Sequence, residues 1–311
     1  MLSRVADSLY WMSRYMERTD GILRMLRISY ASSQDNQSDF SWKPVLKVFS
    51  FLPDNEIALI ENNSRAVLNY MVLDKDNSNS VVNMVTKSRE NARSVQDHIT
   101  KELWQCLNEF YHIVREERLE KMLNEEDPIT VLDGLVKQGM LYYGTAEITM
   151  ARGEGMCFMN IGRYLERAIQ SADILDVKFS DFAYDLNKAA ETTNWKYFLM
   201  SISGYELYLK NYRSGFEPRN ILDQIIFNSH FPRSVEYSVS RVQRYFDRLR
   251  NDRNIDSFNK INVMMGRLRS AVQYSNVQMI SEEGLHNYLK RIHQDLYTIG
   301  SLLNEHYFAY S

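Results

Sequence analysis

The sequence contains few of the residues that interrupt helices. Among its 311 residues there are 12 glycines and 5 prolines, so the frequent turn signals of an all-β or α/β protein are missing. No stretch of convincing length alternates apolar and polar residues in the way that a half-buried strand does. Leu, Met, Glu, Arg, Lys and Gln are abundant instead, and these residues lose little side-chain freedom in a helix. We therefore predict an all-α fold.

Cysteine and long apolar runs are also scarce. Cys106 and Cys157 are the only two cysteines, which are too few for a disulfide framework and favour a reducing compartment. No run approaches the roughly 18 uncharged apolar residues that a membrane span requires. Arg4 and Asp7 come too early for the apolar stretch of a signal peptide. We expect a soluble, cytoplasmic protein with no membrane partner.

Neither sign of charge dominates the composition. With 37 Lys and Arg against 40 Asp and Glu, the formal net charge is −3. A dedicated nucleic-acid binder normally has a strongly basic balance, so no nucleic-acid partner is expected. The 20 Tyr and 14 Phe indicate thick packing between helices rather than a thin coiled coil. The expected architecture is a large multi-helix bundle of about a dozen helices.

Apolar residues at helical spacing predict where the helices lie. The first helix is apolar most of the way round, which is typical of a central element. Asp127-Pro128 is typical of a helix start, and Asn79 or Ser80, and later Ser281, are expected N-caps. The expected helices span residues 3–33, 43–51, 56–73, 81–94, 97–124, 129–150, 156–177, 182–200, 202–212, 219–228, 233–250, 255–279 and 282–308.

The domain organisation is expected to be simple. Polar loops are predicted at 32–38 and 74–80, but no low-complexity linker divides the chain. Residues 1–311 are therefore predicted to form a single helical domain, with a weak subdivision near residue 180.

One pentapeptide occurs twice. The pattern Arg-Tyr-x-Glu-Arg is found at 14–18 and again at 163–167. Residues three and four apart lie on neighbouring rows of a helix, so the Arg, Glu and Arg of each copy are close together. Glu17 borders the apolar stripe of its helix, where a charge has to be paired or bound. The duplication predicts an internal pseudo-repeat around the two motif helices.

Two interpretations of the motif remain open. In the structural one, which the spacing alone favours, the copies brace two central helices through buried ion pairs of Arg14, Glu17, Arg18, Arg163, Glu166 and Arg167. In the functional one, four guanidinium groups exceed two carboxylates, and the surplus charge binds a small anionic ligand or a peptide. If the protein is itself an enzyme, Glu17 and Glu166 are the candidates for a general base.

A third charged cluster follows the second polar loop. Arg89 and Arg93 are four residues apart on one helical face, and they are expected to help line the same ligand site. Glu102, Trp104 and Asn108 come next, on the following helix.

Other chemistry is not indicated. The two Glu-x-x-His pairs, at 109–112 and 283–286, are better explained by chance than by a metal site. Both cysteines are expected to be small buried side chains, and no phosphate-binding Gly-rich loop is present. No metal or cofactor is expected.

Several motifs, in order, resemble the landmarks of the alpha-E family. These are the opening Leu2–Met12 with the first pentapeptide, the Asp74…Asn77…Ser80 loop, Arg89–Arg93, Glu102-Leu103-Trp104 with Asn108, Gly162–Arg167, and Phe231–Val235. The resemblance covers nearly the whole chain. The main departure is Ser13 in the first copy, where the second has Gly162, and it concerns packing more than charge.

The resemblance implies a bacterial α-helical domain and, indirectly, a function. Members are typically encoded beside a circularly permuted ATP-grasp protein, often with transglutaminase-like or peptidase-like proteins. This setting implies an accessory or binding role in amide ligation or peptide modification, with the ATP-grasp protein as partner. The alternatives are that the protein is itself an enzyme of ligation or hydrolysis, or that it is a structural scaffold.

Overall fold

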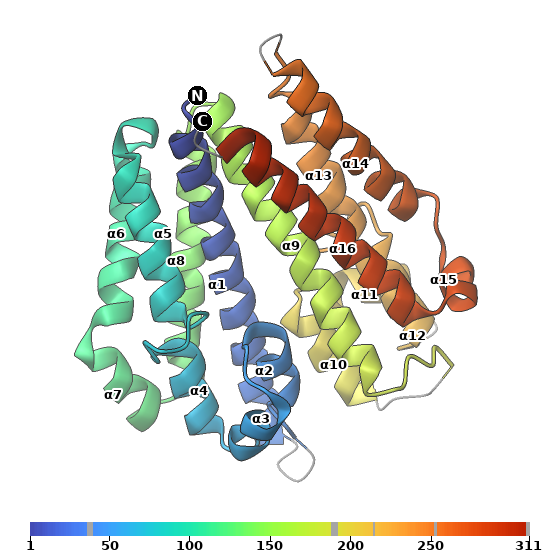
Figure 1. Cartoon of the computed structure of the whole chain (residues 1–311). Helices are drawn as coiled ribbons and strands as arrows, with labels where there is room; N and C mark the ends of the chain where they lie inside the picture. Colours follow the sequence, from blue (N-terminus) through green and yellow to red (C-terminus); the bar gives the residue numbers. More distant parts are fainter. Residues whose placement is uncertain (36–39, 188–191, 214, 252–253, 309–311) are drawn as a thin grey trace. The chain divides into compact units, whose positions relative to one another are not determined.

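The computed structural model describes residues 1–35, 40–187, 192–213, 215–251 and 254–308. In these residues it forms sixteen α-helices and no β-strand (Figure 1). The all-α prediction is confirmed.

The chain forms two compact units. Unit 1 comprises Met1–Tyr10 and Arg152–Ser311, and unit 2 comprises Trp11–Ala151. The first helix, α1 (Ser3–Asp35), is continuous and contributes its first turns to unit 1 and the remainder to unit 2. Residue 180 lies inside unit 1. It is the last residue of α9 (Glu154–Ser180), which packs against α12 (Pro218–Ile226) of the same unit. The single-domain organisation stays a prediction.

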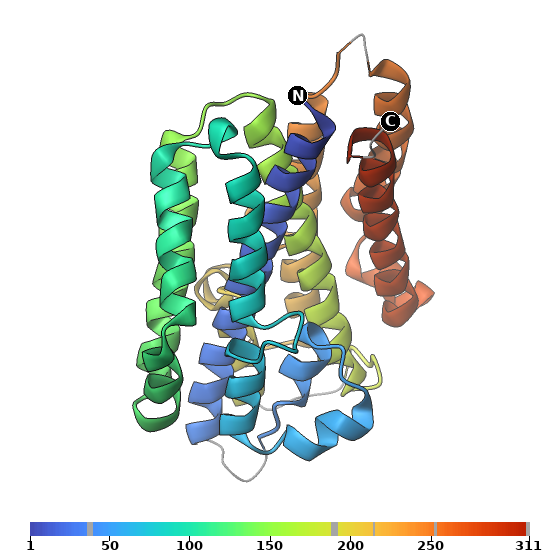
Figure 2. The same ribbon diagram turned by 60° about the vertical axis from the view of Figure 1, so that its left-hand side comes forward.

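Unit 2 is a set of helices of unequal length. Among its longest helices after α1, α6 packs against α5 on one side and against α8 on the other (Figure 2). Phe110 and Tyr142 are among its largest fully buried side chains. The remaining helices of the unit are α2 (Lys43–Phe49), α3 (Asp54–Ile60), α4 (Ser64–Val72), α5 (Val81–Ser94), α6 (Lys101–Arg115), α7 (Glu117–Glu125) and α8 (Pro128–Thr149), with a 3₁₀ turn at Gln96–His98.

Unit 1 is built around α9 (Glu154–Ser180). This helix is buried on nearly every side from Met156 to Leu175 and packs against α12, α13 and α16. A helix that is apolar all round has to be covered all round, so α9 is the central element of the unit. The other helices are α10 (Thr192–Ser201), α11 (Tyr205–Asn211), α12 (Pro218–Ile226), α13 (Val235–Asp247), α14 (Ile255–Gln273), α15 (Val277–Glu283) and α16 (Leu285–Leu303), followed by a π-helical turn at Asn304–Phe308.

Side-chain caps fix several helix starts. The Asp127 carboxylate accepts hydrogen bonds from the amides of Ile129 and Thr130, which confirms the predicted start of α8. Ser80, rather than Asn79, caps α5 by accepting from the amide of Asn83. Ser234 caps α13 in the same way, through the amide of Tyr237.

Three predicted helices are interrupted. The helix expected over 56–73 is two helices, because Asn63 caps α4 by accepting from the amide of Ala66. The helix expected over 97–124 starts later, at a cap formed by Thr100, and breaks at Glu116, which is extended with ψ 130°. Residues 255–279 end at Gln273, and Asn276 caps a separate α15.

Two further predictions on unit 1 were wrong in part. Ser281 lies inside α15 rather than at a cap, since Gly284 ends that helix with a φ of +91°. The helix expected over 182–200 does not begin at 182, because Ala183 and Tyr184 have φ values of +51° and +59°, and the described part of α10 runs from Thr192 to Ser201. Part of that prediction, 188–191, lies outside the described residues, as do residues 36–38 of the first polar loop.

Candidate functional site

The first Arg-Tyr-x-Glu-Arg motif lies on α1, within unit 2. The carboxylate of Glu17 is 0 % exposed and accepts a 2.7 Å hydrogen bond from the hydroxyl of Tyr143 on α8. Arg14 is 8 % exposed, and its guanidinium lies 4.7 Å from the ring centroid of Trp11. The first Arg and the Glu of this motif are therefore interior groups.

Arg18 is more accessible and contacts the Asp74–Ser80 loop. Its Nη1 donates a 3.1 Å hydrogen bond to Oδ1 of Asn79. The loop is held firmly, because the Asn79 side chain also donates to the Phe49 carbonyl and the Asn77 side chain donates to the Tyr70 carbonyl. Two segments that resemble family landmarks thus touch one another inside unit 2.

Lys87 on α5, which was not among the predicted site residues, belongs to the same cluster. Its ammonium donates a 2.9 Å hydrogen bond to the Ser78 carbonyl and lies 5.8 Å from the ring centroid of Tyr15. Partial burial and then the nearby Arg18 lower the pKa of Lys87. Arg18 and Lys87 are therefore two cations that converge on adjacent residues of one loop and repel one another. Lys87 lies seven positions after the capping Ser80. This spacing is the feature of the sequence from which it could have been identified.

An ion pair between a buried acid and a half-buried arginine lies further along α1. Asp20 is 2 % exposed and accepts hydrogen bonds of 2.9 and 2.8 Å from Nε of Arg24. Burial opposes the charge of Arg24, but the carboxylates of Asp20 and Glu17 outweigh it, so the pKa of Arg24 is raised. The four-residue spacing of Asp20 and Arg24 is typical of a helical ion pair and could have identified them.

The second motif lies on α9, within unit 1. Glu166 and Arg167 are 1 % and 6 % exposed, and Arg163 is half-buried. Arg167 donates a 3.2 Å hydrogen bond to the Pro232 carbonyl, and the guanidinium groups of Arg163 and Arg167 lie 5.3 and 5.2 Å from the ring centroid of Tyr164. The amide of Gln170 donates to Glu166 at 3.4 Å.

The two copies make equivalent contacts. The last arginine of each motif, Arg18 or Arg167, hydrogen-bonds to the turn immediately before a helix that is capped by serine. The capping residues are Ser80 and Ser234, and a cation follows seven positions later in each case, Lys87 or Arg241. The pseudo-repeat thus extends beyond the pentapeptide to the helix that each motif contacts.

The copies differ at the residue before the motif. A Cβ on Gly162 would overlap the carbonyl oxygen of Tyr10, so glycine allows α9 and the first turns of α1 to approach closely within unit 1. Ser13, at the corresponding position of the first copy, has its hydroxyl 3.2 Å from that of Tyr142. The difference concerns packing, as the sequence indicated.

Arg89 and Arg93 face elsewhere. Arg89 donates a 2.8 Å hydrogen bond to Asn108 and lies over the rings of Trp104 and Tyr111 on α6. Arg93 is largely exposed and lies 3.7 Å from Glu90. The neighbouring Ser88 contacts α1, through a 3.0 Å hydrogen bond to the Met12 carbonyl. The contacts of Arg89 therefore join it to α6, while Lys87 takes the position beside Arg18.

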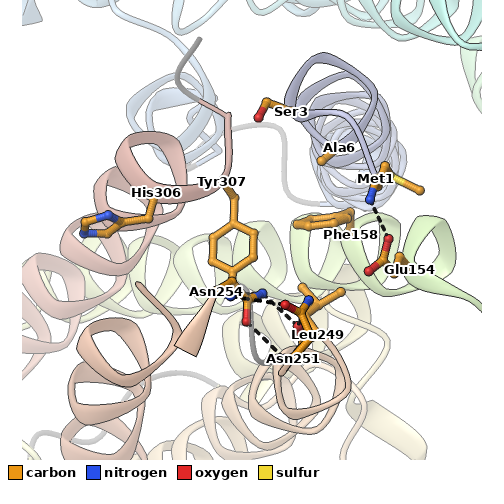
Figure 3. Close-up of a pocket in the computed structure, with 10 residues that line it drawn as sticks. All are labelled: Met1, Ser3, Ala6, Glu154, Phe158, Leu249, Asn251, Asn254, His306 and Tyr307. Atoms are coloured by element: carbon orange, nitrogen blue, oxygen red, sulfur yellow. Dashed lines mark hydrogen bonds and ion pairs between the residues drawn. The ribbon is translucent and has the colours of Figure 1, made fainter. Parts of the chain in front are cut away.

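Unit 1 also contains a cavity of about 620 Å³ (Figure 3). The aromatic side chains of Phe158 and Tyr307 and the imidazole of His306 line it, and Glu154 at its edge forms a 2.8 Å ion pair with the ammonium of Met1. Burial and then Glu154 raise the pKa of Tyr307 to about 12, so its hydroxyl stays protonated. The described lining residues include one carboxylate, which is paired with the Met1 ammonium, and no Lys or Arg side chain.

Metal sites and membrane spans are absent from the described ranges. These residues contain no group of three or more His, Cys, Asp or Glu side chains that could hold a metal ion. Both cysteines are free and buried, as expected. None of the described helices combines the length and the apolar character needed to cross a membrane.

Fold and motifs together define an all-helical protein with a duplicated Arg-Tyr-x-Glu-Arg element. The model of the Alpha-E family, described as a predicted alpha-helical domain with a conserved ER motif, matches residues 1–308. The chain belongs to the Alpha-E family. No curated protein and no solved structure matches it significantly.

Proposed function

We propose that this protein is a cytoplasmic binding subunit of a bacterial amide-ligation or peptide-modification system, with a circularly permuted ATP-grasp protein as its partner. Its role is to hold an anionic ligand or an acidic partner segment at the Arg-Glu motifs. The ATP-grasp partnership rests on the resemblance of the landmarks in the sequence. The anionic ligand rests on the geometry around Arg18.

The convergence of Arg18 and Lys87 is the observation that carries the proposal. Arg18 and Lys87 lie on different helices but bond to the same loop, and the pKa of Lys87 is lowered. A bound anion would offset the repulsion between the two cations. A carboxylate or phosphate oxygen can accept hydrogen bonds from both groups, and such charge-assisted bonds are among the stronger ones. In the sequence of unit 1, Arg167 and Arg241 have the positions that correspond to Arg18 and Lys87.

The buried members of the motifs have a different role in this proposal. Glu17 is 0 % and Glu166 is 1 % exposed, and a carboxylate shielded in this way is poorly placed to take a proton from a substrate. They are better suited to hold the motif helices together than to act as general bases. A binding role is therefore favoured over catalysis by the protein alone.

Anion binding is tested by isothermal titration with two probes, inorganic phosphate and a short polyglutamate peptide. We expect at least one probe to bind, and Lys87→Met to weaken that binding by about tenfold, roughly the value of one charge-assisted hydrogen bond. Lys290→Met removes the charge of another exposed lysine, on α16, and serves as the control. Equal affinity in all three proteins, or no binding of either probe, contradicts the anion site.

The partnership is tested separately by purifying the tagged protein from its own host and identifying what co-elutes. Recovery of an ATP-grasp protein supports the subunit role, and recovery of the protein alone contradicts it. Turnover by the purified protein, lost on changing Glu17 or Glu166, would establish the enzymatic alternative. A complex that forms normally with Lys87→Met and Arg163→Ala proteins would favour a structural scaffold.

A further inference from the structure

The outward face of α8 is apolar although nothing in the described chain covers it. Met140, Leu141 and Ile148 are 56 %, 49 % and 84 % exposed, while Leu135 and Tyr142 on the opposite side are buried in unit 2. A helix that is apolar on both sides is normally covered on both. The outward face therefore has the character of a contact surface.

Its residues follow the spacing of a helix–helix seam. Gly134, Lys137, Leu141, Gly144 and Ile148 are separated alternately by three and four residues, which is the a/d pattern of two helices packed side by side. A Cβ on Gly134 or Gly144 would meet no atom within 4 Å. Packing inside the unit thus does not require these glycines, although each weakens the helix relative to alanine. Both would let the backbone of a second helix approach closely.

A charged residue lies at each end of this surface. The face lines a groove of about 580 Å³, together with Glu102 of α6. Because Thr100, the cap of α6, shares a 2.8 Å hydrogen bond with Thr149 at the end of α8, Glu102 lies at the same end of the groove as Ile148. Lys137 lies about 16 Å away along the helix, at the opposite end.

We propose that this groove binds the same groove of a second copy of the chain, with the two α8 helices antiparallel about a two-fold axis. The surface has a basic residue at one end, apolar residues in the middle and an acidic residue at the other end. When a second copy is turned end to end, its acidic end faces the basic end of the first copy, so the surface is complementary to itself. The two-fold pairing places Lys137 of each copy near Glu102 of the other, with Leu141 and Gly144 at the centre.

The test is sedimentation velocity of the full chain over a wide range of concentration. We expect a monomer–dimer equilibrium whose dissociation constant rises about tenfold or more in Lys137→Glu and in Glu102→Lys, because each places like charges opposite one another. The double variant, with both changes in one chain, recreates complementary pairs under two-fold symmetry and restores the dimer. Lys290→Glu, on an exposed position of α16, leaves the equilibrium unchanged.

A second variant separates dimer loss from misfolding. Gly144→Leu fills space that is open in the monomer and improves helix propensity, so it preserves or raises the melting temperature of the dilute protein while abolishing the dimer. A wild-type protein that stays monomeric at every concentration overturns the proposal, and the face then serves a different partner. Failure of the double charge reversal to restore the dimer overturns the two-fold pairing.

Discussion

Tyr143 on α8 donates a 2.7 Å hydrogen bond to the carboxylate of Glu17 on α1, which has no exposed surface. A buried carboxylate is costly unless its oxygens are hydrogen-bonded or paired. The Tyr143 hydroxyl therefore helps to stabilise the buried Glu17 carboxylate inside unit 2. The hydrogen bond also links two helices that are far apart in the sequence.

Tyr143→Phe should destabilise the protein by about 1–3 kcal/mol, because it leaves an oxygen of a buried carboxylate without this donor. Urea unfolding followed by circular dichroism measures the change. Tyr274→Phe removes the same hydroxyl from a side chain that is 75 % exposed and should change stability by less than about 0.5 kcal/mol. Similar values for both variants would mean that the Glu17 contact contributes little.

Gly162→Ala and Gly266→Ala should have opposite effects. Alanine at 162 pushes its Cβ into the Tyr10 carbonyl and should destabilise by about 1–3 kcal/mol, the usual cost of overpacking. At 266, in the exposed interior of α14, the new Cβ meets no atom within 4 Å, so helix propensity should stabilise by about 0.5–1 kcal/mol. The midpoints of thermal unfolding of the two variants provide the comparison, and a shift in the same direction would contradict it.

The pair of His293 and Asp173 should make stability depend on pH. His293 Nε2 lies 2.7 Å from Oδ1 of Asp173. Burial alone lowers the pKa of His293, but the Asp173 carboxylate, with the Ile169 carbonyl and Asp176, outweighs it, so the pKa is raised above its ordinary value of 6.5. A raised folded-state pKa stabilises the protein fully below pH of about 6.5, and this contribution is lost as pH rises through the folded-state pKa.

Comparison with His293→Gln isolates this contribution. The wild-type protein should exceed the variant in unfolding free energy most at pH of about 6, and the difference should shrink steadily toward alkaline pH. A difference that is constant with pH, or that grows with pH, would show that the ion pair does not stabilise the fold.

The two thiols should be unreactive in the folded protein. Cys106 and Cys157 are buried, and burial is the main reason that the pKa of each is raised. Because the thiolate is the reactive form, modification by iodoacetamide at neutral pH should be slow in buffer and fast in guanidinium chloride. Rapid labelling of either cysteine in buffer, detected by mass spectrometry, would contradict the buried placement.

The helical fold could be predicted because its signals are local. Few glycines and prolines, apolar spacing and caps such as Asp127 identify the elements without any knowledge of their neighbours. The interruptions were missed for the same reason. Glu116 adopts an extended conformation within a segment whose composition favours a continuous helix, and Gly284 supplies a positive φ that ends a helix in an otherwise regular pattern.

The site could be predicted only in part. The duplicated motif identified Arg18 and Glu17, but their partners Asn79, Lys87 and Tyr143 lie on other helices or loops, and single-sequence periodicity does not reveal which elements meet. For Arg89, the spacing in the sequence suggested one set of neighbours and the structure shows another. Its spacing to Arg93 suggested a shared ligand site, whereas the structure places it against Asn108 and Trp104.

The division of α1 between two units has a consequence for how the chain is made. Residues 11–151 of unit 2 leave the ribosome as one uninterrupted stretch and can fold while synthesis continues. Met1–Tyr10 cannot be buried then, because its partners belong to unit 1: the ring of Tyr10 packs 5.0 Å from that of Phe308. The first turns of α1 thus stay uncovered until α9 has been translated, and they lack the Phe308 contact until that residue follows. A nascent chain that stops before α9 would present them to chaperones and proteases.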